Sequence, residues 1–267
     1  MNKLFVVLPA FNEAENICET IEKWEFESEK IDDMYIDTVE IIVVDDGSSD
    51  NTILEVKSMR QMYDNITIIA HDKNKGLGEA VKTGINYVSE NGDSEDYMCV
   101  MDADNTQSPV FFHDMLRKLY EAKADCVISS RFQRGAKIQG VPLFRNFMSY
   151  GARAFYSLSM NVPAVKDYTC GYRLYRVSIL KDALRVFGDN IIEERGFTCM
   201  VELLYKLYRV GARFAEVPFE LRYDMKKGQS KMKVVRNALK SINFGLTLRR
   251  IEIAENGKAI KNYKKAA

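Results

Sequence analysis

Residues 97–104 read Tyr-Met-Cys-Val-Met-Asp-Ala-Asp, an apolar run that ends in two acidic residues two positions apart. A short run of this kind is typical of a strand that is buried on both faces of a parallel sheet. Side chains two residues apart in an extended segment point to the same side, so Asp102 and Asp104 can face one cation. Proteins commonly hold Mg²⁺ or Mn²⁺ with one or two carboxylates and the phosphate oxygens of a substrate. The stretch therefore predicts a strand that leads into a metal and diphosphate site.

Four further apolar runs occur in the first half of the chain, and helical patterns separate them. This alternation predicts an α/β fold with an open, mostly parallel, twisted sheet flanked by helices. Ligands bind beyond the carboxyl ends of the strands in such sheets. That position favours a ligand site at Asp102 and Asp104 over the alternative, an ordinary capping turn. The runs are residues 4–10, 40–45, 66–71 and 125–130, and the helical patterns are residues 13–26, 51–63, 78–90 and 109–122.

The second half of the chain has a weaker pattern. We expect one catalytic domain over residues 1–230, with a donor half up to about 135 and an acceptor half from about 136. Residues 231–267 should form a basic amphipathic helix and a tail. The helices expected in this half are 143–159, 176–187, 198–210 and, in the basic segment, 232–250, with one strand at 213–222.

Composition limits where the protein is expected to act. The chain is 46% hydrophobic and 28% charged, as is usual for a soluble domain, and no apolar run reaches the roughly 18 residues of a membrane span. The amino terminus lacks the pattern of a secretory signal. Five scattered cysteines without a C-x-x-C pair predict reduced thiols and no zinc site. We therefore expect a cytoplasmic protein.

Asp45 and Asp46 close the second predicted strand, just before Gly47. A carboxylate at this place can accept hydrogen bonds from a nucleobase or from ribose hydroxyls. Gly47 permits a sharp turn that brings the backbone close to a ligand. The alternative is a turn in which Asp50 caps the next helix, and we expect that cap to form as well. The pattern predicts a nucleotide site.

Residues 72–80, Asp-Lys-Asn-Lys-Gly-Leu-Gly-Glu-Ala, superficially match a dinucleotide-binding loop. Val81 occupies the third glycine position, and the first strand-to-helix turn, after Ala10, contains no glycine. Both facts argue against a nicotinamide-dependent dehydrogenase. We interpret Gly76 and Gly78 as residues that let the backbone approach a ligand at a helix start, with an ordinary helix-entry loop as the alternative.

Four segments, in order, resemble the signature of family 2 inverting glycosyltransferases of the GT-A fold. Three later segments are similar to those of dolichol- or polyprenyl-phosphate sugar synthases, the mannosyl synthases among them. The absence of a Gln-x-x-Arg-Trp sequence argues against a processive polymerase. The four segments are residues 8–13 (Leu-Pro-Ala-Phe-Asn-Glu), 44–50 (Val-Asp-Asp-Gly-Ser-Ser-Asp), 74–78 (Asn-Lys-Gly-Leu-Gly) and 101–104 (Met-Asp-Ala-Asp). The three are residues 129–132 (Ser-Ser-Arg-Phe), 167–173 (Asp-Tyr-Thr-Cys-Gly-Tyr-Arg) and 228–231 (Gly-Gln-Ser-Lys).

This resemblance implies a nucleotide-sugar donor, a GDP- or UDP-sugar, and Mg²⁺ or Mn²⁺ as cofactor. It assigns the metal to Asp102, Asp104 and Gln107, although Thr106 stands where the glutamine is usual. It assigns catalysis to Asp104, Asp167 and Arg131. Further positive charge for phosphates would come from Lys231 or Arg222. Donor binding is assigned to Pro9, Ala10, Asn12, Glu13, Asp45, Asp46, Lys75, Gly76, Asp102, Ala103 and Lys231.

Two acceptors remain open for such an enzyme. Inverting transfer is a single displacement whose main need is charge neutralisation on the leaving diphosphate. A polyprenyl phosphate is already anionic and needs little help from a base. A hydroxyl of a glycan, lipopolysaccharide or capsule precursor needs a positioned carboxylate, for which Asp167 is the first candidate and Glu193 and Glu194 come next. We favour the polyprenyl phosphate, used at the cytoplasmic face of the membrane.

The end of the chain is strongly basic. Residues 226–267 carry twelve Lys or Arg and two Asp or Glu, and their apolar residues recur at helical spacing. This pattern favours peripheral binding to an anionic membrane surface. The alternatives are a solvated tail, packing on the domain or in a homodimer, and binding to nucleic acid. The last is disfavoured because the segment has few aromatic residues for stacking on bases.

Overall fold

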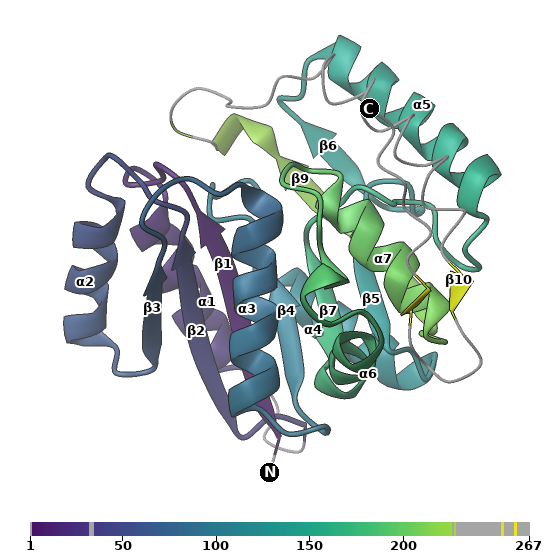
Figure 1. The fold of residues 1–267 in the computed structure, drawn as a ribbon. Coiled ribbons are helices and arrows are strands. Elements are labelled where there is room, and N and C mark those ends of the chain that lie inside the picture. The colour runs from purple at the N-terminus through teal and green to yellow at the C-terminus, as the bar shows by residue number, and fades with distance from the viewer. Residues whose placement is uncertain (1, 32–34, 226, 228–251, 254–258, 261–267) are drawn as a thin grey trace.

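The computed structural model describes residues 2–31, 35–225, 227, 252–253 and 259–260 (Figure 1). The strands are β1 (Lys3–Ala10), β2 (Thr38–Asp45), β3 (Ile66–Ala70), β4 (Tyr97–Val100), β5 (Cys126–Ser130), β6 (Lys137–Gln139), β7 (Arg173–Arg176), β8 (Phe214–Pro218), β9 (Glu220–Arg222), β10 (Glu252–Ile253) and β11 (Ala259–Ile260). The helices are α1 (Ile17–Ser28), α2 (Thr52–Met62), α3 (Leu77–Asn91), α4 (Phe111–Glu121), α5 (Leu143–Met160), α6 (Val177–Phe187), η1 (Gly188–Ile191), α7 (Cys199–Arg209) and η2 (Tyr223–Met225).

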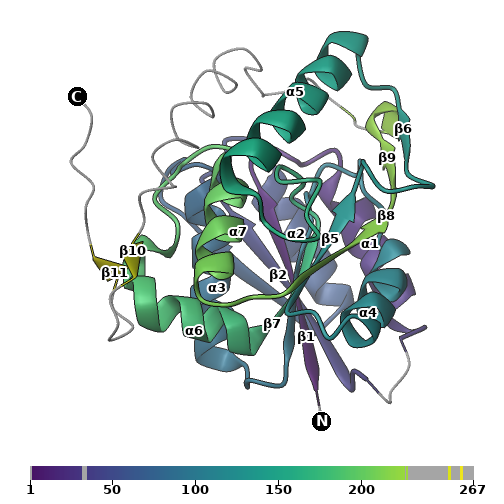
Figure 2. The same cartoon turned by 90° about the vertical axis from the view of Figure 1, so that its right-hand side faces the viewer.

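The main sheet has seven strands among the described residues, in the order β3-β2-β1-β4-β7-β5-β8. All neighbours pair in parallel except β7, which is antiparallel to both β4 and β5. Helices α3, α6 and α7 cover one face and α1 and α4 the other (Figure 2). Two short pairs, β6 with β9 and β10 with β11, lie outside this sheet. The predicted α/β class with a mostly parallel sheet is confirmed.

The central strands are apolar almost without interruption because both of their faces are buried in the core. Residues 4–8 of β1 and 41–44 of β2 are all 0% exposed, because helices cover both faces of the sheet. Each such side chain stabilises the fold by about 1.5–3 kcal/mol relative to exposure. All five cysteines are free thiols. Among the described helices, none is both long and apolar enough to cross a bilayer.

Strand β7 was not predicted, since Arg-Leu-Tyr-Arg does not read as a buried strand. Arg173 is nevertheless fully buried, because its guanidinium donates hydrogen bonds to the carbonyl groups of Tyr168, Cys170 and Met200 at 2.7–2.8 Å. β7 inserts between β4 and β5, so strands from both sides of residue 135 share one sheet. The two expected halves of the domain therefore contribute strands to one sheet.

Three other details differ from the predicted elements or lie beyond what is described. The first helix begins at Ile17 instead of residue 13, because residues 11–16 form a turn. The strand expected at 213–222 is broken into β8 and β9, which belong to different sheets. The helix expected at 232–250, the segment 228–231 and Lys231 lie outside the described residues.

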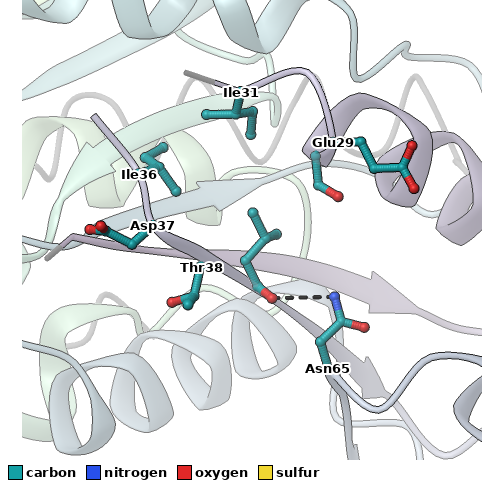
Figure 3. Close-up of a pocket in the computed structure, with 8 residues that line it drawn as sticks. Glu29, Ile31, Ile36, Asp37, Thr38 and Asn65 are labelled. Atoms are coloured by element: carbon teal, nitrogen blue, oxygen red, sulfur yellow. Dashed lines mark hydrogen bonds between the residues drawn. The ribbon is translucent and has the colours of Figure 1, made fainter. Parts of the chain in front are cut away.

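A pocket of about 190 Å³ lies at the amino ends of the strands, where Glu29, Thr38 and Asn65 line it (Figure 3). Asn65 Nδ2 donates a 3.2 Å hydrogen bond to the carbonyl of Val39 at its edge. The acidic motifs stand at the other end of these strands. The pocket is therefore not part of the candidate site.

Candidate active site

The ends of β1, β2 and β4 meet at one edge of the sheet. The register pairs Ala10 with Asp45 and Val7 with Val100. Beyond the strands, the backbone N–H of Asp46 donates to the carbonyl of Ala10 at 2.8 Å, and that of Met101 to the carbonyl of Val7 at 3.2 Å. The predicted residues at the three strand ends are thus brought together.

The turn after β1 is locked to the turn after β2. Asn12 has a φ of 54°, which asparagine tolerates better than most residues. Its backbone N–H donates to Ser48 Oγ, and its Oδ1 accepts from the backbone N–H of Ser49, both at 2.8 Å. The backbone N–H of Glu13 donates to Thr52 Oγ1 at 2.8 Å. Asn12 therefore braces the turn after β1 against the turn after β2.

Asp45 is buried and incompletely satisfied. Its side chain is 1% exposed, and Oδ2 accepts from the backbone N–H of Ser48 at 3.0 Å. Its Oδ1 has no hydrogen-bond partner among the described residues. A buried carboxylate oxygen without a partner costs free energy, so a ligand N–H or hydroxyl would stabilise it. Nearby, Asp50 Oδ1 accepts from the backbone N–H of Thr52 at 3.0 Å, but the predicted cap is not formed as expected, because Asn51 occupies the N-cap position of α2.

Asp46 holds the loop that carries the glycines. Its two carboxylate oxygens accept from the backbone N–H groups of Lys75 and Gly76 at 2.8 Å each, and His71 Nδ1 lies 2.8 Å from Oδ1. The close approach also needs Gly47, since a Cβ there would lie 2.3 Å from the carbonyl carbon of Lys73. His71 was not predicted as a site residue. It directly follows β3 at the same edge of the sheet, so the rule that ligands bind beyond the carboxyl ends of parallel strands could have identified it.

The first turn of α3, directly after this loop, packs on the segment before α7. The backbone N–H of Gly78 donates to the carbonyl of Arg195 at 3.1 Å. A Cβ on Gly78 would lie 1.8 Å from the carbonyl oxygen of Glu194. Glu202, which is 1% exposed, fixes that segment by accepting from the backbone N–H groups of Glu193 and Glu194 at 3.0 and 2.8 Å. Glu193 and Glu194, the secondary candidates for a base, thus lie in a loop just ahead of a helix.

We expect Gly78→Ala to destabilise the protein by about 1–3 kcal/mol, since the new methyl group must displace backbone. Urea unfolding would measure this loss. Gly151→Ala is the matched control, because nothing lies within 4 Å of a Cβ there and alanine favours helix. The control should gain about 0.5–1 kcal/mol. Equal stability of the two variants would contradict the packing described.

Hydrogen bonds within the loop after β4 orient the two candidate metal-binding carboxylates, Asp102 and Asp104. Gln107 Nε2 donates to Asp102 Oδ2 at 2.8 Å, and Gln107 Oε1 accepts from the backbone N–H of Asp102 at 3.2 Å. Asp104 Oδ1 accepts from Thr106 Oγ1 at 2.7 Å. Both functional atoms of Gln107 are therefore used on Asp102, and its direct ligation of a metal stays a prediction.

The donor set fits a hard divalent cation. Asp102 and Asp104 are both partly exposed carboxylates in the loop after β4. A Cβ at Gly171 would lie 3.2 Å from Asp102 Oδ1, so glycine keeps this side of the carboxylate open. No cluster of three His, Cys, Asp or Glu side chains suited to a metal occurs among the described residues. A cation here would need further oxygen atoms from a substrate, as is usual for Mg²⁺.

Arg131 and Asp167 form a buried ion pair. Arg131 Nε and Nη2 donate to Asp167 Oδ2 and Oδ1 at 2.8 and 2.7 Å, and the backbone N–H of Cys170 donates to Oδ1 at 3.1 Å. Asp167 is 0% exposed and the Arg131 side chain 17%. Burial raises the pKa of Asp167, but the charge and hydrogen bonds of Arg131 outweigh it, so the pKa lies below its ordinary value. The carboxylate is held ionised and fixes the guanidinium.

Strand β9 and the residues that follow it contact the loop after β4 and the turn before α1. The backbone N–H of Arg222 donates to the carbonyl of Thr106 at 2.9 Å, and its guanidinium pairs with Asp224 at 2.7 Å. Asn16, 2% exposed, exchanges two 3.2 Å hydrogen bonds with the backbone of Lys227. Asn16 also donates to the carboxylate of Glu13 at 2.8 Å. Asn16 was missed because the sequence carries no signal for a partner 211 positions away.

Comparison with known proteins finds one relative that this chain spans almost completely and one of which it spans little more than half. The protein family described as glycosyl transferase family 2 matches residues 5–184. An undecaprenyl-phosphate mannosyltransferase from Micrococcus luteus is 28% identical over 232 residues, which cover 86% of this chain and 87% of that protein. A dolichol-phosphate mannosyltransferase from Pyrococcus furiosus is 29% identical over 235 residues, with 86% and 59% covered.

The fold is also that of a solved enzyme. The structure of glucosyl-3-phosphoglycerate synthase from Mycobacterium tuberculosis in complex with Mn²⁺, uridine diphosphate and glucosyl-3-phosphoglycerate superposes with a TM-score of 0.65. The match covers 92% of this chain and 80% of that one, at 18% sequence identity. At this identity the likeness establishes a shared architecture.

Proposed function

The chain belongs to glycosyl transferase family 2, and we propose that it transfers a sugar, with inversion, from a nucleotide-sugar donor to a polyprenyl phosphate at the inner face of the membrane. The observation that carries this proposal is the meeting of Asp45, Asp102 and Asp104 at the carboxyl edge of the sheet. The names of the two mannosyltransferase relatives support the acceptor class.

The donor nucleotide would lie over the turns after β1 and β2. Asp45 Oδ1, buried and lacking a partner among the described residues, would accept a hydrogen bond from the base or ribose. The brace made by Asn12 would hold Pro9, Ala10 and Glu13 at the donor. We propose that Asp46 acts indirectly, because its oxygens already bind the backbone of Lys75 and Gly76.

Asp102 and Asp104 would hold Mg²⁺ or Mn²⁺, together with diphosphate oxygens of the donor. When bound, the cation supplies Lewis-acid stabilisation of the leaving diphosphate. Gln107 would orient Asp102 through its two hydrogen bonds. The chain thereby fixes both carboxylates before the donor arrives, which avoids reorganisation during the reaction.

Arg131 would bind phosphate oxygens of the acceptor or of the leaving group, with Asp167 as its anchor. Asp167 is unsuited to take a proton, because its pKa is lowered and Arg131 occupies both of its oxygens. An acceptor that is already a phosphate anion needs no such base. The proposed acceptor and the buried ion pair are therefore mutually consistent.

The experiment that tests the function measures nucleoside diphosphate release from GDP- and UDP-sugars with Mn²⁺ or Mg²⁺ present. We expect polyprenyl phosphate to raise the release from one donor by at least about tenfold over the hydrolytic background, because only the acceptor completes the displacement. An oligosaccharide is the control acceptor. Stimulation by the oligosaccharide and not by the lipid phosphate would refute the proposed acceptor.

A further inference from the structure

Strand β8 contains a buried carboxylate in an otherwise apolar run. Glu216 stands in the middle of Phe-Ala-Glu-Val-Pro and is 7% exposed. Glutamate is seldom buried in this way unless a cation pairs with it. Among the described residues, the partners of this carboxylate are three N–H donors and no cation. These three hydrogen bonds must therefore compensate for the burial of Glu216.

The carboxylate of Glu216 binds two segments of the chain at once. Its Oε1 accepts from the backbone N–H groups of Lys166 and Asp167, both at 2.7 Å. Its Oε2 accepts from Gln133 Nε2 at 2.9 Å. An ionised carboxylate, which only accepts hydrogen bonds, suits a set of three donors. Glu216 therefore ties residues 166–167 to the segment that follows β5.

These two segments carry the buried ion pair of the candidate site. Gln133 lies two positions after Arg131, and Asp167 is itself one of the residues whose backbone Glu216 holds. Arg131 also donates its backbone N–H to Asp167 Oδ2 at 3.1 Å, in addition to the two bonds from its guanidinium. Glu216 is therefore bound on both sides of the pair, beside the arginine and at the backbone of the aspartate.

The loop that carries Asp167 depends on side-chain acceptors. Residues 161–172 join α5 to β7 without a helix or strand, and Ala164 has a φ of 64°, which is unfavourable for alanine. Backbone N–H groups in such a loop have no ladder partners, so another acceptor must satisfy them. Strand β8 is a rigid support for that acceptor, because it pairs along its whole length with β5, which ends directly before Arg131.

We propose that Glu216 is a positioning residue, which holds the Asp167 loop and the segment after β5 in the arrangement that directs Arg131 at phosphate. This proposal rests on the proposed function, since it assumes that Arg131 binds phosphate during sugar transfer. In this role Glu216 needs no contact with a substrate, because it acts through the ion pair. A guanidinium binds phosphate in a fixed direction, so a small displacement of Asp167 lowers the rate.

Two substitutions of Glu216 test the geometry. Glu216→Ala should lower the rate of sugar transfer about ten- to a hundredfold, because the Asp167 loop loses its acceptor. Glu216→Gln should keep the rate within about threefold, since its Oε1 can accept from both backbone N–H groups and the amide of Gln133 can turn over to accept from its Nε2. Equal losses in the two variants would overturn the proposal.

Asp96→Ala is the matched control. Asp96 is 5% exposed and accepts from the backbone N–H groups of Lys3 and Asp93 at 2.7 Å each, but it precedes β4 and so lies at the opposite edge of the sheet. This variant should become less stable to urea, as Glu216→Ala does, while its transfer rate stays within about twofold of the unaltered protein. A fall in rate equal to that of Glu216→Ala would contradict a specific role for Glu216.

A cycle of double substitutions tests the route through Arg131. In a protein that already carries Arg131→Met, adding Glu216→Ala should lower the remaining rate by less than about twofold, because no guanidinium is left to position. Gln133→Ala breaks only the link beside Arg131 and replaces Glu216→Ala in the cycle if that variant does not fold. A loss in the Arg131→Met background as large as in the unaltered protein would refute the proposal.

Urea unfolding tests the same link without reference to activity. The falls in the unfolding midpoint caused by Glu216→Ala and Arg131→Met should be less than additive, because a freed loop lets the Asp167 carboxylate reach water once the arginine is gone. Additive falls would argue decisively against the proposal. If the unaltered protein transferred sugar to no acceptor, the proposed function would fail, and the unfolding cycle would still decide the role of Glu216.

Discussion

Asp104→Asn is expected to lower metal-dependent sugar transfer by about a hundred- to a thousandfold, because the loss of one charged oxygen ligand removes stabilisation of the leaving diphosphate. Asparagine keeps the size of the side chain and can still accept the hydrogen bond from Thr106. The fold should therefore survive the change. Product release measured against the concentration of Mn²⁺ and of Mg²⁺ would show both a lower rate and a weaker dependence on the cation.

Asp114→Asn provides the control for the Asp104 variant. Asp114 lies on α4, is 46% exposed and pairs with the exposed Arg117. Exposed pairs of this kind contribute about 0–1 kcal/mol to stability. Transfer activity should be unchanged in this variant. Full activity of Asp104→Asn, with an unaltered cation requirement, would remove the basis for the proposed metal site.

Asp167→Asn is expected to reduce both stability and activity. It leaves the Arg131 guanidinium buried without its counter-charge, which costs about 3 kcal/mol, the lower part of the usual range because Arg131 keeps 17% exposure. The arginine would also lose its orientation toward phosphate, so transfer should fall about a hundredfold. Urea unfolding and the transfer rate measure the two effects.

A second experiment distinguishes two roles for Asp167, which are to orient Arg131 or to accept a proton as a general base. Combining Asp167→Asn with Arg131→Met removes both buried charges, so part of the lost stability should return while activity stays low. A general base would behave differently, since Asp167→Asn would then lower the rate and leave unfolding unchanged. That second pattern would restore Asp167 as a proton acceptor and favour a hydroxyl acceptor.

The ion pair also predicts how stability depends on pH. The pKa of Asp167 in the folded protein lies below its ordinary value of about 3.9, so the folded state binds this proton less readily than the unfolded state. Its stabilisation is complete above about pH 5 and is lost as the pH falls through the folded pKa. The stability difference between the unaltered protein and Asp167→Asn should therefore narrow below about pH 4.

The sequence was sufficient to predict the candidate site residues that stand at the ends of strands. It was not sufficient to predict the residues whose side chains bind the backbone of loops. Asp45 and Asp102 follow apolar runs, and a parallel sheet necessarily brings such ends to one edge. Asn16 binds the backbone of Lys227, 211 positions away, and Glu202 binds the backbone of the irregular loop ahead of its own helix. Periodic sequence patterns carry no information about either set of partners. The family resemblance supplied Arg131 and Asp167, but only the structure shows that they pair.

The antiparallel strand β7 was absent from the predicted elements, and the reason for this omission is physical. A buried arginine is too costly to expect unless several acceptors surround it. Arg173 meets that condition through two carbonyl groups of the loop before β7 and one of α7. Those acceptors exist only in the assembled fold, so neither the hydrophobic period nor the composition of residues 173–176 could reveal the strand.

The insertion of β7 between β4 and β5 has a consequence for biosynthesis. β5 leaves the ribosome well before the strand that joins it to β4, since residues 131–172 separate the two in sequence. Closing so long a segment carries an entropic cost before any pairing is gained, and contacts of large sequence separation slow folding. The three strands β1, β2 and β3 can pair early, whereas the part of the sheet beyond β4 is completed only after β7 has emerged. A nascent chain would therefore join the turns after β1 and β2 first and complete the sheet next to Arg131 and Asp167 last.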